Sequence, residues 1–272
     1  MEENYQVLLE RIENQSNSLH AMELRRKMLQ GLLFAPMDAG NSEYVLISGC
    51  HGPFSMLHLS NLVSLFRHLG INFTFLAEER CCGNSYLKHV KKDTPADTIA
   101  MLEDHAVNSM RKNIARAKEL GTNKIVTSCP GCTTTYNHFL GDDEGIELHY
   151  YPQLLLNYIG SPELPGAINF YEACHKPHRT PKYKIDTVSS RRLIEKIKGL
   201  EIREIPNFCC MQETGVKKIF EKADTGTIVT PTSCCFIYMR AASHRLKGPR
   251  IRPLPALLNE ALGVKNPIAD EV

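Results

Sequence analysis

Short apolar runs rich in β-favouring residues alternate along this chain with longer segments whose apolar residues recur at helical spacing. In the first half, strands are predicted at 43–50, 72–76 and 124–127, and helices at 54–69 and 95–120. Thr94 is the candidate N-cap of the second helix, with Pro95 at its first position and Gly121 after its end. This β-α-β-α-β order predicts a parallel sheet with helices on its faces.

The same alternation begins again beyond Gly145. Strands are predicted at 146–150, 167–171, 202–205 and 227–230, and helices at 153–159, 188–197 and 254–262. The fold class is therefore predicted to be α/β. We expect two pseudo-symmetric halves, each a small, mostly parallel sheet with flanking helices, and an N-terminal helical extension.

The extension covers residues 1–41, followed by a first half at 42–160 and a second half at 161–272. Its segment 3–34 predicts two helices broken near 14–17. Their apolar faces could pack on the chain's own core or dock onto a partner subunit, and residue spacing does not separate the two.

Every cysteine follows a predicted strand. The ten cysteines are Cys50, Cys81, Cys82, Cys129, Cys132, Cys174, Cys209, Cys210, Cys234 and Cys235. The carboxyl ends of parallel strands meet at one edge of a sheet, where α/β folds place their sites. We therefore expect the thiols to gather there. The Cys129-Pro-Gly-Cys132 spacing lets one short loop point two sulfurs at one metal centre.

Composition favours metal ligation over disulfides. The N-terminus is acidic and polar without a signal-peptide pattern, and three Cys-Cys pairs are awkward for ordinary bridges. No apolar run approaches the ~20 residues that span a bilayer. A net charge of +2 gives no reason to expect nucleic acid or an anionic membrane surface. We expect a soluble protein in a reducing compartment.

The cysteine pattern is duplicated. Cys174 lies 124 residues after Cys50, and Cys209 lies 128 residues after Cys81, so each half carries five cysteines. A structural zinc ion or a cubane [4Fe–4S] cluster uses four ligands. Five thiolates suit a larger or more open iron–sulfur assembly, unless one cysteine of each half is an inert spare.

This spacing, Cys50-x30-Cys81-Cys82-Gly83-x45-Cys129-x-x-Cys132, resembles the cysteine-rich CCG domain family, whose best-known member is the B subunit of heterodisulfide reductase. The resemblance extends over about residues 43–264. It implies two noncubane [4Fe–4S] clusters that face each other, with all ten cysteines as ligands. It also implies that a substrate disulfide is split between the clusters with electrons from a ferredoxin-like partner subunit.

The second half departs from the family pattern. Met211 replaces the glycine after Cys209-Cys210, and the chain has Thr230-Pro-Thr-Ser-Cys-Cys235 where the family has Thr-x-Cys-Pro-x-Cys. If Thr230 keeps the register, Thr232 occupies a ligand position. The second centre could then be differently ligated, of another type, or replaced by zinc. A pure electron relay stays open.

Histidines flank the cysteines. His51, His175 and His178 could donate protons to a departing thiolate, although hydrogen bonding to cluster sulfurs is the commoner role. The sequence has no glycine-rich phosphate loop, so electrons must come from partners, a ferredoxin-like iron–sulfur subunit and a flavin-containing subunit. We expect a cytoplasmic iron–sulfur subunit, heterodisulfide-reductase-B-like and membrane-associated at most through partners. The alternative is a non-catalytic electron relay or a zinc-stabilised assembly subunit.

Overall fold

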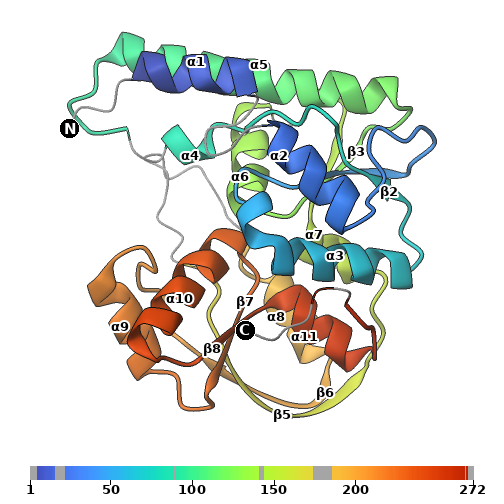
Figure 1. Cartoon of the computed structure of the whole chain (residues 1–272), viewed down its shortest axis with the longest axis vertical. Coiled ribbons are helices and arrows are strands. Elements are labelled where there is room, and N and C mark those ends of the chain that lie inside the picture. Colours follow the sequence, from blue (N-terminus) through green and yellow to red (C-terminus); the bar gives the residue numbers. More distant parts are fainter. Residues whose placement is uncertain are drawn as a thin grey trace. The chain divides into compact units, whose positions relative to one another are not determined.

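The computed structural model describes residues 5–15, 22–87, 90–140, 144–173, 186–266 and 268 (Figure 1). The described residues form two compact units. The first takes its residues from 5–53 and 72–150, and the second from 54–71, 151–173 and 186–268. The chain therefore passes between the units more than once.

The first unit is built on a four-stranded parallel sheet with the order β2-β1-β3-β4. Its strands are β1 (Tyr44–Ile47), β2 (Phe73–Thr74), β3 (Lys124–Thr127) and β4 (Glu147–Tyr150). Its helices are α1 (Tyr5–Gln15), α2 (Met22–Arg26), the π-helix η1 (Lys27–Leu32), α4 (Asn84–Leu87), α5 (Ala96–Glu119) and α6 (Pro130–Phe139). All residues of β1 are buried, as expected for a parallel strand covered on both faces.

The second unit repeats this plan with the strand order β6-β5-β7-β8, again parallel throughout. Its strands are β5 (Glu163–Phe170), β6 (Lys198–Glu204), β7 (Thr227–Thr230) and β8 (Arg250–Pro253). Its helices are α3 (Met56–His68), α7 (Tyr151–Leu155), α8 (Ser189–Glu195), α9 (Glu213–Glu221), α10 (Ser233–Leu246) and α11 (Leu254–Ala261), and the short 3-10 turn η2 (Pro53–Ser55) precedes α3.

The predicted fold class is confirmed. Replacing β1, β2, β3 and β4 by β5, β6, β7 and β8 converts one strand order into the other, so the two sheets share one topology. The connections differ, because α3 follows β1 in the chain but belongs to the second unit, where it packs on α11. There Asn259 Nδ2 donates to the side-chain and backbone oxygens of Asn61. The proposed boundaries at residues 41 and 160 stay a prediction.

Several local expectations are wrong. The helix predicted at 153–159 is α7 at Tyr151–Leu155, and β8 was not predicted. The N-cap of α5 is Pro95 rather than Thr94, because the Thr94 hydroxyl accepts a hydrogen bond from the Lys91 amide instead of capping the helix. The helix predicted at 188–197 ends at Glu195. It ends there because β6 begins three residues later at Lys198, which pairs with Glu163 of β5. Strand pairing with β5 has overridden the helical pattern at this boundary.

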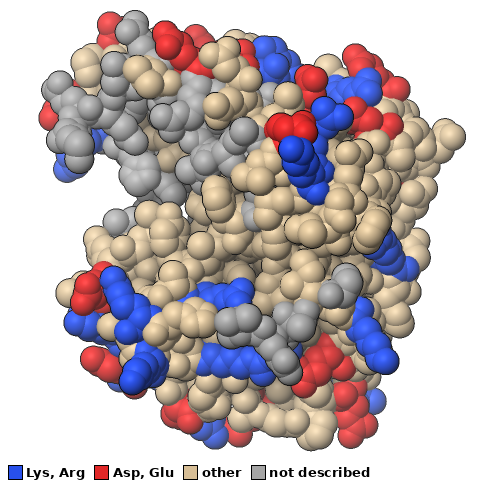
Figure 2. All heavy atoms as spheres, in the orientation of Figure 1, with Lys and Arg blue, Asp and Glu red and all other residues tan. Residues whose placement is uncertain are grey.

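Surface charge is mixed. On the face shown in Figure 2, basic and acidic side chains occur in small groups separated by uncharged surface. In the part of the chain that the structure describes, no helix is both long and apolar enough to cross a membrane.

Candidate thiol-rich metal centre

The first five cysteines lie where the strands of the first sheet end. Cys50 follows β1, Cys81 and Cys82 follow β2, and Cys129 follows β3. Cys129 is also the N-cap of α6 in an extended conformation, and Pro130 occupies the first helical position, where a missing amide hydrogen costs nothing. Cys132 therefore sits in the first turn of α6. The carboxyl edge of one parallel sheet gathers all five thiols, as the sequence predicts.

These thiols form a chain of contacts. Cys82 Sγ lies 3.3 Å from Cys132 Sγ. Cys81 shares hydrogen bonds with Cys50 on one side and Cys82 on the other, and Cys132 shares one with Cys129. Four of the five side chains are buried, and Cys129 is partly exposed. The result is a compact set of sulfur donors inside the first unit.

The thiols perturb one another's acidity. The hydrogen bond to Cys81, assisted by burial and by the neighbouring thiols, raises the pKa of Cys50. The hydrogen bonds from Cys50 and Cys82 lower the pKa of Cys81 despite burial. The pKa of Cys132 is raised by its contacts with Cys129 and Cys82 and by burial. Like charges in so small a volume resist ionising together, and a bound cation removes that resistance.

A buried ion pair holds two of the cysteine loops together. Glu79, two residues before Cys81, accepts hydrogen bonds from the amides of Ser48 (2.7 Å) and Gly49 (2.8 Å), just ahead of Cys50. Arg25 of α2 donates to Glu79 Oε2 at 2.7 Å, and the two side chains are only 1% and 2% exposed. The N-terminal extension thus contributes a side chain to the support of the first cysteine set.

Arg25 makes two further bonds inside the unit. Its Nη1 donates to the Leu76 carbonyl at 2.7 Å, and its Nε donates to Ser48 Oγ at 3.0 Å. Neither member of the pair is predicted from the sequence. A charged residue is rarely buried unless paired, and nothing in the sequence shows that residues 25 and 79 meet.

The cysteine pair after β2 is fixed from α5. Asn113 accepts from the Arg80 amide and donates to the Arg80 carbonyl, each at 2.8 Å. Its amide also donates to Tyr136 Oη on α6 at 2.9 Å. Tyr136 is buried. Burial raises its pKa, so its hydroxyl stays neutral beside the thiols.

Gly83 is required by the loop it ends. Its φ of +85° lies in the left-handed region, and a Cβ built there would lie 2.5 Å from Ala106 Cβ of α5. Met211 occupies the corresponding place after Cys209-Cys210 and is 46% exposed. It is not among the described residues with positive φ. The second loop therefore leaves its cysteine pair along a different path, which removes the need for glycine.

The second set is similar in plan. Cys209 and Cys210 follow β6, and Cys234 and Cys235 lie in the first turn of α10, after β7. Cys210 Sγ lies 3.4 Å from Cys235 Sγ, and both side chains belong to the hydrophobic core of the second unit. The predicted site residues Cys174, His175 and His178 lie outside the described residues.

His51 is the one predicted histidine that the structure describes. Its Nδ1 lies 3.4 Å from Cys50 Sγ, within hydrogen-bonding distance of that sulfur. Within the described ranges, no three His, Cys, Asp or Glu side chains are arranged to hold a single metal ion. The roles assigned to the cysteines and histidines stay predictions.

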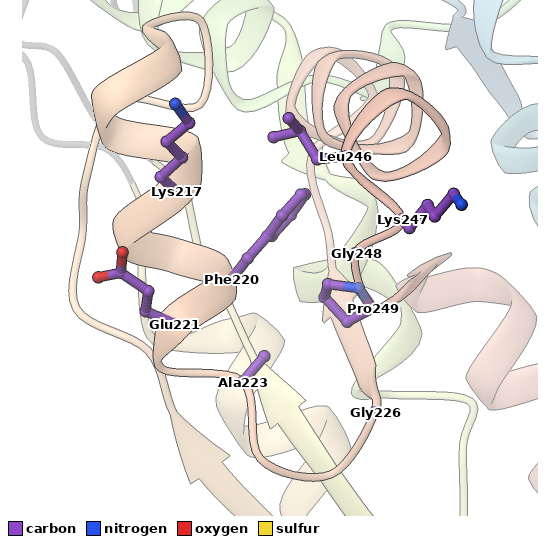
Figure 3. A pocket seen from close by; sticks show the side chains of 9 residues that line it. All are labelled: Lys217, Phe220, Glu221, Ala223, Gly226, Leu246, Lys247, Gly248 and Pro249. Atoms are coloured by element: carbon purple, nitrogen blue, oxygen red, sulfur yellow. The ribbon is translucent and has the colours of Figure 1, made fainter.

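A separate pocket of about 580 Å³ lies in the second unit, beside the amino ends of β7 and β8 (Figure 3). It is lined by Lys217, Phe220, Glu221, Ala223, Gly226, Leu246, Lys247, Gly248 and Pro249. The Phe220 ring packs against Gly248 in the turn after α10. A Cβ at Gly248 would lie only 2.7 Å from this ring. None of the predicted site residues lines this pocket.

The fold and the cysteine loops define an α/β protein with a thiol-rich centre at the carboxyl edge of a parallel sheet. Residues 44–137 match the family model described as the cysteine-rich domain, CCG. This match lies in the first half of the chain and agrees with the family that the cysteine spacing resembles. The match includes all five cysteines of the first set.

Relatives resemble a larger part of the chain at low identity. The D subunit of the dihydromethanophenazine:CoB–CoM heterodisulfide reductase of Methanosarcina barkeri is 22% identical over 68% of this chain and 47% of that protein. Its counterpart in Methanosarcina acetivorans is 22% identical over 86% of this chain and 63% of that protein. An iron–sulfur protein of Methanocaldococcus jannaschii is 21% identical over 75% of this chain and 39% of that protein. The chain thus spans between 39% and 63% of the length of these relatives.

Among solved structures, the chain is similar to glutamate racemase from Thermus thermophilus. That match has 14% identity, covers 86% of this chain and 84% of that one, and has a TM-score of 0.29. A TM-score this low carries no inference about fold or function.

Proposed function

We propose that the chain is an iron–sulfur subunit of a redox complex related to heterodisulfide reductase. The observation that carries the proposal is the convergence of Cys50, Cys81, Cys82, Cys129 and Cys132 in one set, of which all but Cys129 are buried. Soft thiolates of this kind select iron–sulfur clusters or zinc among biological metal centres. Five linked thiols exceed the four that a single tetrahedral ion uses.

The residues around the thiols suit such a centre. Ser85 Oγ lies 3.6 Å from Cys81 Sγ, and His51 Nδ1 lies 3.4 Å from Cys50 Sγ. Polar groups beside ligand sulfurs tune the reduction potential of a cluster. The Arg25–Glu79 pair holds the backbone ahead of Cys50 and Cys81, so the ligands keep their positions when the charge of the centre changes.

Support for the redox role comes from the relatives, two of which are heterodisulfide reductase subunits and one an iron–sulfur protein. An iron–sulfur cluster supplies one-electron transfer when bound. In this proposal the first set holds a noncubane [4Fe–4S] cluster and a second centre lies in the other half. A disulfide or a similar substrate is the electron acceptor. A ferredoxin-like subunit, with a flavin-containing subunit behind it, delivers the electrons in the cytoplasm.

Metal analysis tests the proposal. Iron, acid-labile sulfide and zinc should be counted per chain on protein purified without oxygen. About eight irons with matching sulfide would support a [4Fe–4S] cluster in each half, and disulfide cleavage becomes the leading reaction. About four irons with one zinc would favour the alternative, an electron relay with a structural second half. A chain that binds neither iron nor sulfide would refute the iron–sulfur assignment.

A further inference from the structure

The two halves do not present equal ligand sets, and the structure allows their positions to be matched. β3 ends at Thr127, and the N-cap of α6 follows two residues later at Cys129. β7 ends at Thr230, and the N-cap of α10 follows two residues later at Thr232. Both N-caps have extended backbone conformations, with φ, ψ of −127°, 127° and −101°, 119°.

The sulfur contacts confirm this register. Cys132 is the third residue of α6, and Cys235 is the third residue of α10. Each lies against the second member of its Cys-Cys pair, Cys82 at 3.3 Å in the first unit and Cys210 at 3.4 Å in the second. Cys235 is therefore the counterpart of Cys132, and Thr232 is the counterpart of Cys129.

Cys234 then corresponds to Gly131, which is not a ligand position. In the first unit this position has no room for a side chain, because a Cβ at Gly131 would lie 2.2 Å from Asn84 Nδ2. On a helix, adjacent residues project about 100° apart, so Cys234 and Cys235 do not face the same point. Cys234 is partly exposed, whereas Cys235 is 1% exposed.

Thr232 does not supply the missing sulfur. Its side chain is 2% exposed, and its hydroxyl donates a hydrogen bond to the Glu172 carbonyl at 3.2 Å. A neutral hydroxyl is also a poor ligand for iron in a sulfur-rich centre compared with a thiolate.

We propose that the second centre is bound with one thiolate fewer than the first, Thr232 replacing Cys129 and Cys234 lying outside the ligand set. Among the residues that the structure describes, the ligands of the second half are then Cys209, Cys210 and Cys235. This inference rests on the proposed function, since it concerns how the same kind of centre is held. It predicts that the two halves carry centres of different ligation.

Thiol labelling tests the inference on the unaltered chain. Metal-loaded protein, kept without oxygen, is treated with iodoacetamide, and each cysteine is followed by peptide mass spectrometry. We expect Cys234 to be alkylated at least tenfold faster than Cys235 and Cys209, which metal ligation protects. Equal protection of Cys234 and Cys235 would overturn the inference.

Three variants extend the test. Cys234→Ser should keep the iron and sulfide content of the wild type, whereas Cys235→Ser should lose the metal of the second centre. Thr232→Cys should keep the metal and change the EPR spectrum of that centre. Cys132→Ser is the matched control, because it should lose the metal of the first centre only.

The outcomes separate the two proposals. A metal-loaded wild type whose Cys234→Ser variant loses as much metal as Cys235→Ser would overturn the ligand assignment alone. A wild type with neither iron nor zinc would overturn the proposed function and this inference with it. Circular dichroism of each variant identifies loss of metal that comes only from misfolding.

Discussion

At the scale of single residues, the charged pair Arg25–Glu79 is the least expected feature of the first unit. Both side chains are almost fully buried, and Glu79 joins the backbone before Cys50 to the segment before Cys81. Removing one partner of a buried pair leaves an uncompensated charge, which costs more than the pair contributes.

Arg25→Gln should therefore lower the free energy of unfolding by on the order of 3–5 kcal/mol. Urea unfolding of the reduced chain under nitrogen measures the change. Arg26→Gln, at the exposed neighbouring position, should change it by no more than about 0.5 kcal/mol. Equal effects of the two substitutions would show that the buried pair does not support the fold.

His58 is a second buried polar residue, on α3 of the second unit. It is fully buried, its ring lies edge-on to Tyr151, and neither ring nitrogen has a hydrogen-bond partner among the described residues. Burial lowers the pKa of His58 from 6.5 to about 3. The folded chain therefore keeps this imidazole neutral where the unfolded chain protonates it.

A pH dependence follows from that shift. Between pH 6.5 and about 3 the unfolded state binds the additional proton, so the free energy of unfolding should fall as the pH falls through this window. The full loss is on the order of 4–5 kcal/mol. His58→Leu should flatten the pH profile, measured by urea unfolding at several pH values. The control His68→Leu, at an exposed site of the same helix, should leave it unchanged. A profile that His58→Leu does not alter would contradict this account.

At the scale of elements, helix starts and strand ends position the thiols. α6 and α10 each begin shortly after a strand. In both, the N-cap residue lies two residues beyond the end of the strand, so the strand fixes where the first turn of the helix lies. α5 supports the loop between β2 and α4 through Asn113 and through close contact at Gly83.

Gly83 gives a prediction at this scale. Gly83→Ala combines a left-handed backbone with a close contact to Ala106, and we expect a loss of about 2–5 kcal/mol in the free energy of unfolding. Gly70→Ala is the matched control, because Gly70 has φ +67° but open space around its Cβ position. It should cost only about 1–2 kcal/mol for the backbone strain. Thermal and urea unfolding of both variants measure the difference, and equal costs would refute the packing argument.

At the scale of the whole molecule, each unit has its own parallel sheet and its own sulfur contacts. Loss of one centre should therefore loosen mainly the unit that holds it. In Cys132→Ser we expect amide exchange in β1 and β3 to speed up at least tenfold, with little change in β7 and β8. A tenfold increase corresponds to a loss of about 1.4 kcal/mol in the free energy of opening.

Cys235→Ser should show the reverse pattern. Hydrogen exchange with mass spectrometry measures both variants, and the metal-free wild type separates loss of metal from the effect of the serine itself. If amide exchange became equally faster in the strands of both sheets in either variant, the centres would not stabilise their units separately.

Local sequence pattern was enough to predict β1 to β7, most helices and the place of the described thiols at strand ends, but it did not predict β8. Apolar runs predict strands, and cysteines directly after parallel strands must meet at one sheet edge. The duplicated spacing likewise predicted the shared topology of the two sheets.

The remaining features depend on distant contacts, and the folded structure alone reveals them. It pairs Arg25 with Glu79, places α3 on α11, and shows Asn113 holding the Arg80 backbone. It also supports the register under which the sequence places Thr232 at a ligand position, because that register depends on where β7 ends and α10 begins. Sequence spacing records which residues follow a strand, but the approach of two side chains depends on the packing of segments far apart in the chain.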